Sequence, residues 1–246
     1  GHAAWVNQAA LDIAGVARET PDPYGGKIIR DTDGNPTGVL IDSAKALVFE
    51  KLPPLSDEEE HEAMEVAIQE CLRDGLTTVH DMGVDTTDLR LYKEFIDGGR
   101  FPMRIYAAIG GPVGEPWNTF LASGPVVGYG NQRLTVRALK LYVDGALGSR
   151  GAALIEPYTD DPENRGLTLT SEEDLQKAVD DALQNGFQVC THAIGDRGNN
   201  IILNVYERAL QRYPREDHRL RVEHAQVLVP EDIPRFKQMG VVPSMQ

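Results

Sequence analysis

From residue 56 to residue 246 the chain alternates segments of helical period with short apolar, β-branched segments. A helix is predicted to begin at Ser56, where Glu59 completes a capping box, and another at Ser171. Four of the six predicted strands lie at 77–81, 104–109, 137–145 and 241–245, and the other two lie in the strand-then-turn segments 188–196 and 220–226. Strands that alternate with helices run parallel and are joined by right-handed crossovers. The pattern therefore predicts an α/β fold, with a β/α barrel favoured and an open doubly wound sheet as the alternative.

Residues 1–55 lie outside this repeat. A short helix is predicted at about 4–14, and strands at 27–31 and 38–42 flank the turn sequence DGNP, which is a hairpin signal. We interpret residues 1–55 as an excursion from the main fold, and residues 56–246 as the partial barrel.

The overall composition limits the classes of function. A length of 246 residues suits one barrel domain, and a formal net charge of −14 disfavours nucleic acid and anionic membranes as partners. No apolar run approaches the ~18 residues of a membrane span, and no signal-peptide pattern is recognisable, so we expect a cytoplasmic protein. Cys71 and Cys190 show no disulfide or zinc-finger spacing and are predicted to be free, buried thiols.

Two histidines stand at the ends of successive predicted strands. His192 and His224 each follow a run of apolar residues, and Lys140 lies in a third strand. Because the carboxyl ends of barrel strands meet at one face, we expect these side chains to converge there. A neutral imidazole is a common ligand of catalytic metals, so the pattern favours a metal hydrolase. The alternative for each histidine is a hydrogen-bonded core residue without a metal.

Lys140 has two interpretations. Side chains alternate along a strand, so Lys140, Tyr142 and Asp144 are predicted to share the face that points into the barrel. Burial favours the neutral amine of a lysine, which can react with carbon dioxide to give a carbamate with two metal-binding oxygens. The alternative is an ion pair with Asp144 or Asp81.

Other polar residues are predicted around this centre. The residues expected directly behind the ligands are His80, Asp81 and Asp144. By strand alternation, Glu223 is predicted to point away from His224, toward an outer helix.

Three further residues are candidates for substrate binding. Trp5 and Asn7 are candidates for contacts over the pocket mouth, with anchoring of the excursion as the alternative for Trp5. Arg150 either binds an anionic substrate group or pins the long loop 146–170 by a salt bridge, and we favour the loop role.

The order of several short motifs resembles the amidohydrolase superfamily, in particular the amidohydrolase-3 branch that includes N-substituted formamide deformylases. No single motif is specific, but together they span the whole chain in the family's order. The matching motifs are GHAAWVN at 1–7, TPDP at 20–23, PTGVL at 36–40, VHDMG at 79–83, KLYVDGALGSR at 140–150, THAIGDR at 191–197, VEHAQ at 222–226 and PSMQ at 243–246.

The resemblance implies a metal-dependent (β/α)8 TIM-type barrel, of which this chain would hold strands two to seven, with residues 1–55 following strand one. It implies one or two divalent ions, commonly zinc. Lys140 would be the carboxylated bridging lysine, and His192 and His224 the ligands after the fifth and sixth strands. The family's His-x-His pair is absent from this sequence, and its aspartate on the eighth strand lies beyond it, so one ion is expected here. His2 maps to the excursion and is not expected to replace that pair.

The function implied is hydrolysis of amide or formamide C–N bonds in a small-molecule substrate by metal-activated water. Without the pair and the aspartate, the 246-residue piece alone is expected to be weakly active or inactive. The alternatives are a deaminase or esterase of the same superfamily, a non-catalytic binding module, and a structural barrel without metal. Open barrel edges invite pairing, so a homo-oligomer that covers them is also expected.

Overall fold

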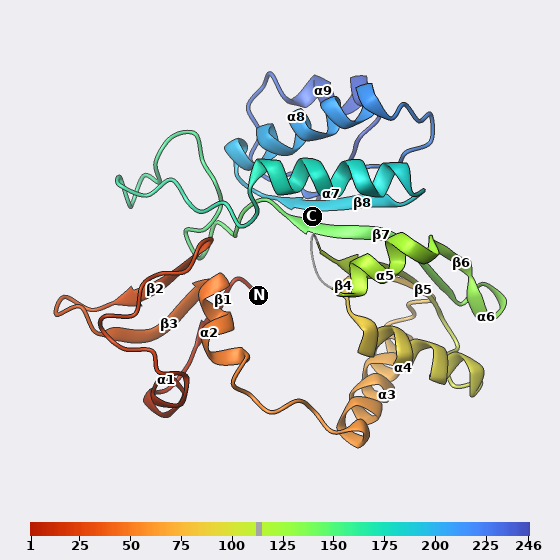
Figure 1. Ribbon diagram of the computed structural model, residues 1–246, viewed down its shortest axis with the longest axis horizontal. Helices are drawn as coiled ribbons and strands as arrows, with labels where there is room; N and C mark the ends of the chain where they lie inside the picture. Colours follow the sequence, from red (N-terminus) through yellow and green to blue (C-terminus); the bar gives the residue numbers. More distant parts are fainter. Residues whose placement is uncertain (112–114) are drawn as a thin grey trace.

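A computed structural model of the chain describes residues 1–111 and 115–246. It contains a small antiparallel sheet near the N-terminus and a larger, mainly parallel sheet (Figure 1). The small sheet has the order β1-β3-β2, with β1 (Ala3–Trp5), β2 (Gly26–Arg30) and β3 (Pro36–Asp42). The predicted hairpin is confirmed as the antiparallel pair β2 and β3.

The first helix is shorter than predicted. Residues 3–5 form β1, because Ala4 pairs with Leu40 of β3, and α1 (Gln8–Ala14) begins only after Asn7 caps it. The 3-10 turn η1 (Ser43–Lys45) and α2 (Ala46–Phe49) follow β3.

The larger sheet keeps the order of its parallel strands along the chain. The parallel strands are β4 (Thr78–Val84), β5 (Arg104–Gly110), β7 (Leu134–Tyr142), β8 (Gln188–Ala193), β9 (Arg221–His224) and β10 (Val242–Ser244). Each pairs in parallel with the next. A doubly wound sheet would reverse its order at a switch point, so that alternative is wrong and the fold is a partial β/α barrel.

The helices agree with the predicted alternation, with additions in one segment. The helices flanking the strands are α3 (Asp57–Arg73), α4 (Thr86–Asp97), α7 (Glu172–Gln184), α8 (Asp196–Arg212) and α9 (Ile233–Met239). The predicted capping box of Ser56 and Glu59 is present, and the Ser171 side chain caps α7. The segment predicted as a loop before the Lys140 strand also contains α5 (Glu115–Ser123), β6 (Val126–Gly128) and α6 (Tyr129–Gln132). None of the helices in the described ranges combines the length and apolar character needed to cross a bilayer.

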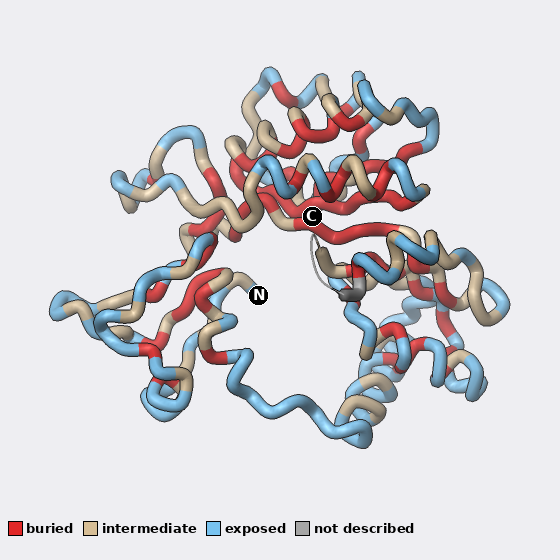
Figure 2. The backbone as a smooth tube through the Cα atoms, viewed as in Figure 1, coloured by how far each residue is buried: buried red, intermediate tan, exposed pale blue. Residues whose placement is uncertain are grey.

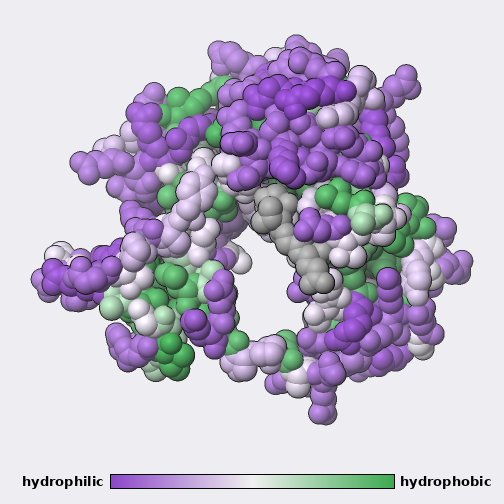
Figure 3. All heavy atoms as spheres, viewed as in Figure 1, coloured by the Kyte–Doolittle hydropathy of each residue, from purple (hydrophilic) through white to green (hydrophobic). Residues whose placement is uncertain are grey.

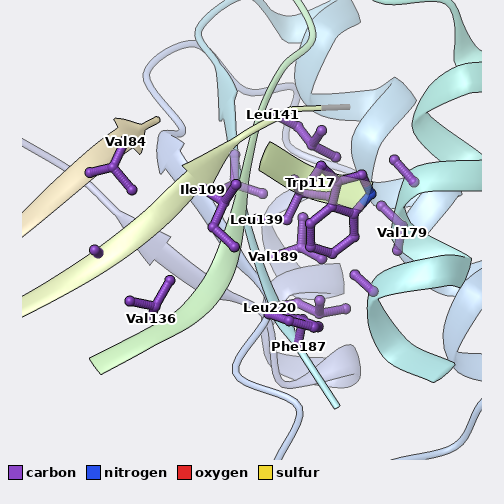
Figure 4. Packing of buried hydrophobic residues seen from close by; sticks show 14 of the residues in the cluster. Val84, Ile109, Trp117, Val136, Leu139, Leu141, Val179, Phe187, Val189 and Leu220 are labelled. Atoms are coloured by element: carbon purple, nitrogen blue, oxygen red, sulfur yellow. The ribbon is translucent and has the colours of Figure 1, made fainter. Parts of the chain in front are cut away.

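The core lies between the sheet and its outer helices. Leu139, Leu141 and Val189 point outward from β7 and β8 and pack with Trp117 and Phe187, whose rings lie 5.1 Å apart (Figure 4). Buried residues follow β7, β8 and the helix faces that cover them (Figure 2). The β7 side chains that face the helices are therefore apolar, as predicted. Lys140 and Tyr142 lie on the opposite, inner face of the strand.

The two cysteines are expected to differ strongly in reactivity. Cys190 is fully buried with Ala108 and Ala138 on the inner face of the sheet, and burial raises the pKa of its thiol to about 12. Cys71 on α3 is only half-buried, so the prediction of a buried thiol is wrong for this residue. Because the thiolate is the reactive form, iodoacetamide should label Cys71 about 100-fold faster in the native protein at neutral pH. Peptide mass spectrometry measures both rates, and equal labelling before urea is added would contradict this burial.

Candidate functional site

The carboxyl ends of β7, β8 and β9 bring the two predicted histidines together. The register places Tyr142 beside His192, and Ala193 beside His224. The His192 and His224 rings lie 4.7 Å apart between centroids, at an interplanar angle of 71°. The convergence predicted from the strand pattern is therefore present in the structure.

His192 is held in one orientation. Its side chain is buried, and its Nε2 lies 3.1 Å from the carbonyl oxygen of Gly145. A carbonyl only accepts, so Nε2 carries the proton and Nδ1 keeps its lone pair. Burial lowers the pKa of His192 to about 3, so the ring is neutral at physiological pH. A neutral ring with its other nitrogen bonded to a carbonyl is the arrangement of most metal-ligating histidines.

Asp144 sits behind His192 and joins two loops. It is fully buried, its Oδ2 accepts from the backbone N–H groups of Ala153 and Gly195, both at 2.8 Å, and its Oδ1 accepts from Ile194 at 3.0 Å. Its Oδ1 also lies 3.5 Å from Nε2 of His192. Burial raises the pKa of this carboxyl to about 6 against the opposing effect of the three N–H donors.

Lys140 is buried without an acidic partner in the described part of the chain. Its exposed fraction is 4%, its Nζ donates to the carbonyl oxygen of Leu141 at 3.0 Å, and it lies 3.3 Å from the centre of the Tyr142 ring. Burial lowers the pKa of its amine to about 7. The ion pairs considered as an alternative do not form, because Asp144 accepts from backbone N–H groups and Asp81 accepts from Tyr92.

The predicted orientation of Glu223 is wrong. Val222 packs in the helix-facing core, so Glu223 points inward, where it pairs with Arg221 at 2.8 Å and acts electrostatically on Lys140. Strict alternation would then turn His224 outward. His224 instead has a φ of 76° and Ala225 a φ of 43°, and this left-handed backbone breaks the alternation and points the imidazole toward His192.

The inner face below the histidines carries a polar layer. His80 stacks on Tyr106 with ring centroids 5.0 Å apart, and its Nδ1 lies 2.9 Å from Nη1 of Arg221. The Tyr106 hydroxyl donates to Gln188. His80 therefore contacts Arg221 and Tyr106 in place of the two histidines at the strand ends.

Four other predicted residues lie away from His192 and His224. Asp81 faces α4, where Tyr92 donates to it. Trp5 is 86% exposed, and the Asn7 side chain accepts from Ala10 as the cap of α1. Arg150 pairs with Asp160 inside the long loop, the arrangement that the favoured loop role requires.

His2 is the residue that the sequence interpretation missed. The small sheet brings its ring to 4.7 Å from the His192 ring, and its Nδ1 lies 2.6 Å from Oδ1 of Asp42. A cavity of about 400 Å³ opens beside it, lined by Gly1, His2, Asp42, Ser43, Lys45, Tyr142 and Leu169. The surface is hollowed between the small sheet and the parallel sheet (Figure 3). His2 and Asp42 lie 40 positions apart in the sequence, so no local pattern signals their contact.

The donor set limits how a metal ion could be held. Within residues 1–111 and 115–246, no group of three or more His, Cys, Asp or Glu side chains is close enough to bind one. His192 and His224 supply two nitrogens, and the buried Lys140 is the candidate for a third ligand. The set fits a divalent ion when Lys140 contributes oxygens as a carbamate.

Comparisons with known proteins agree with this geometry. A family model described as "Amidohydrolase family" matches residues 1–246. Protein LONG AFTER FAR-RED 3 of Arabidopsis thaliana is 38% identical over 258 residues, covering 100% of this chain and 44% of that protein. N-substituted formamide deformylase of Arthrobacter pascens is 26% identical over 260 residues, covering 98% of this chain and 45% of that protein.

A solved structure shares the fold. The crystal structure of an uncharacterised metal-dependent hydrolase from Pyrococcus horikoshii OT3 superposes with a TM-score of 0.76 at 26% identity, covering 100% of this chain and 47% of that one. The chain thus spans about half the length of the relatives that it matches.

Proposed function

Because this chain belongs to the amidohydrolase family, we propose that the protein hydrolyses amide or formamide C–N bonds with a divalent metal ion, zinc by preference, held by Lys140, His192 and His224. The observation that supports the proposal is the contact between His192 and His224 at one end of the parallel sheet, with the buried Lys140 on the neighbouring strand β7. The family identified from the sequence motifs is confirmed by the match over residues 1–246.

His192 and Lys140 would contribute different kinds of ligand atom. His192 offers Nδ1, because Gly145 occupies its Nε2. Lys140, with its pKa near 7, is in part a neutral amine at physiological pH. Its nitrogen forms a bond to the carbon of carbon dioxide and loses a proton to solvent, which leaves a carbamate with two oxygens. A divalent ion bound there would polarise the scissile carbonyl and lower the pKa of a water molecule.

Three carboxylates of this region already serve as hydrogen-bond acceptors. Asp144 accepts three backbone N–H groups, and Asp81 accepts from Tyr92 on the outer face. Asp196 accepts from the backbone of Ile155 and Arg197. This arrangement favours a second candidate function for residues 1–246 alone, a module that binds substrate without turning it over. Deamination and ester hydrolysis are the other candidate reactions, and assays with an amide, an ester and an aminopyrimidine distinguish them.

The metal site is tested by replacing its histidines. His192→Ala and His224→Ala are each expected to lower the metal affinity by about 100-fold or more. Loss of a residue that only hydrogen-bonds to a ligand costs about 10- to 100-fold, and loss of the ligand itself should cost more. Elemental analysis of the protein as its gene encodes it measures the bound metal. His61→Ala is the control, because His61 lies on α3 and pairs with Glu94. Unchanged metal content in both site variants would refute the site.

A further inference from the structure

Asp42 holds an unfavourable backbone conformation beside the site. Its φ is 46° and its ψ is −118°, and the residue is 3% exposed. A non-glycine residue in such a region is strained and persists only when its surroundings fix it. The strain places the carboxylate at the end of β3, directly against His2.

The loop after β7 is shaped around this carboxylate. A side chain at Gly145 would come within 2.2 Å of Oδ2 of Asp42, and one at Gly151 within 2.5 Å. A side chain at either position would force the Asp42 carboxylate to move. This oxygen also lacks a hydrogen-bond partner among the described residues. Gly145 is the residue whose carbonyl orients His192, so Asp42 packs on the same loop as the proposed metal ligand.

The hydrogen bond between His2 and Asp42 also determines which ring nitrogen of His2 is free to bind a ligand. A carboxylate only accepts, so the Nδ1 of His2 carries the proton in the 2.6 Å bond to Asp42. In the neutral ring the Nε2 then offers a lone pair. His2 lines the cavity beside the site and keeps 25% of its side chain exposed, so a ligand can reach it.

We infer that His2 is a substrate-binding residue whose Nε2 accepts the N–H of the scissile amide, with Asp42 as its positioning residue. The inference rests on the proposed function. His2 lines the cavity, and its ring centroid lies 4.7 Å from that of the proposed ligand His192, so both rings can contact the same substrate. The residue therefore selects primary and N-monosubstituted amides over N,N-disubstituted amides, which have no N–H to donate.

The test compares N-butylformamide with N-butyl-N-methylformamide, using the protein as its gene encodes it. His2→Ala and Asp42→Ala are expected to lower kcat/KM for the N–H substrate by about 10- to 100-fold, the effect of one lost hydrogen bond at a partly buried site. The N-methyl substrate should change by less than about 3-fold. His2→Gln and Asp42→Asn keep an acceptor and should retain part of the preference. His61→Ala is the control for an unrelated histidine.

The outcomes separate this inference from the proposed function. An equal decline on both substrates, or no decline, would overturn the role of His2 while leaving the hydrolase intact. Loss of metal in His2→Ala would make it a ligand and also overturn the inference. If the wild type hydrolyses neither amide, the proposed function fails. Calorimetric measurement of the binding of the two amides then tests the role of His2. Tighter binding of the N–H amide by the wild type, with this preference lost in His2→Ala, supports the inference. Any other result overturns the inference.

Discussion

Lys140→Met is expected to lower the metal affinity of the protein by more than about 100-fold, and hydrolysis with it, whereas Lys140→Glu keeps most of the metal. Methionine matches the unbranched stem of lysine, so the buried position stays packed while the nitrogen is lost. Glutamate supplies a permanent carboxylate in place of the carbamate. Elemental analysis after dialysis against a fixed zinc concentration measures the difference.

Carbon dioxide provides an independent measurement of the same residue. The amine becomes available as its proton leaves, so metal content at a fixed bicarbonate concentration should rise as the pH increases through the pKa of Lys140, about 7. Removing bicarbonate should lower the metal content of wild type and leave that of Lys140→Glu unchanged. Lys177→Met is the control, because Lys177 is exposed and pairs with Asp181. Full metal content in Lys140→Met would show that His192 and His224 bind the ion without this residue.

The fold could be predicted because its determinants are local. The capping box at Ser56, the cap at Ser171 and the apolar runs of the six strands each act within a few residues. The three-residue strands β1 and β6 were missed, because so short a segment has no period and is defined by its partner. Pairing of Ala4 with Leu40 is a contact in space that local sequence does not encode.

The residues of the site likewise fall into those that local sequence predicts and those that it does not. Lys140 and His192 lie in regular strands, so alternation gives the correct face. Glu223 was assigned to the wrong face because the left-handed backbone at His224 interrupts the alternation, and neither residue is a glycine that would signal it. His2 could not be predicted at all, since it reaches the site only through the fold of the small sheet.

Asp144→Asn should lower the free energy of unfolding by about 1–3 kcal/mol, the cost of leaving a buried donor without its partner. The carboxylate accepts three backbone N–H groups while fully buried. An asparagine has one acceptor oxygen, so in either orientation its amide N–H₂ faces at least one backbone donor, and that donor loses its partner. Urea unfolding of the metal-free protein at a pH above about 6, where Asp144 is ionised, measures the loss without the contribution of a ligand.

The same substitution tests how the site is held together. Asp144 joins the start of the long loop, at Ala153, to the end of β8, at Ile194 and Gly195, so its loss should loosen the Gly145 carbonyl that orients His192. Metal affinity is therefore expected to fall along with stability, although Asp144 is not a ligand. Asp217→Asn is the matched control, since Asp217 is exposed beside Arg219 and its loss should leave the urea midpoint unchanged. If Asp144→Asn costs less than about 1 kcal/mol, these buried hydrogen bonds do not hold the two loops together.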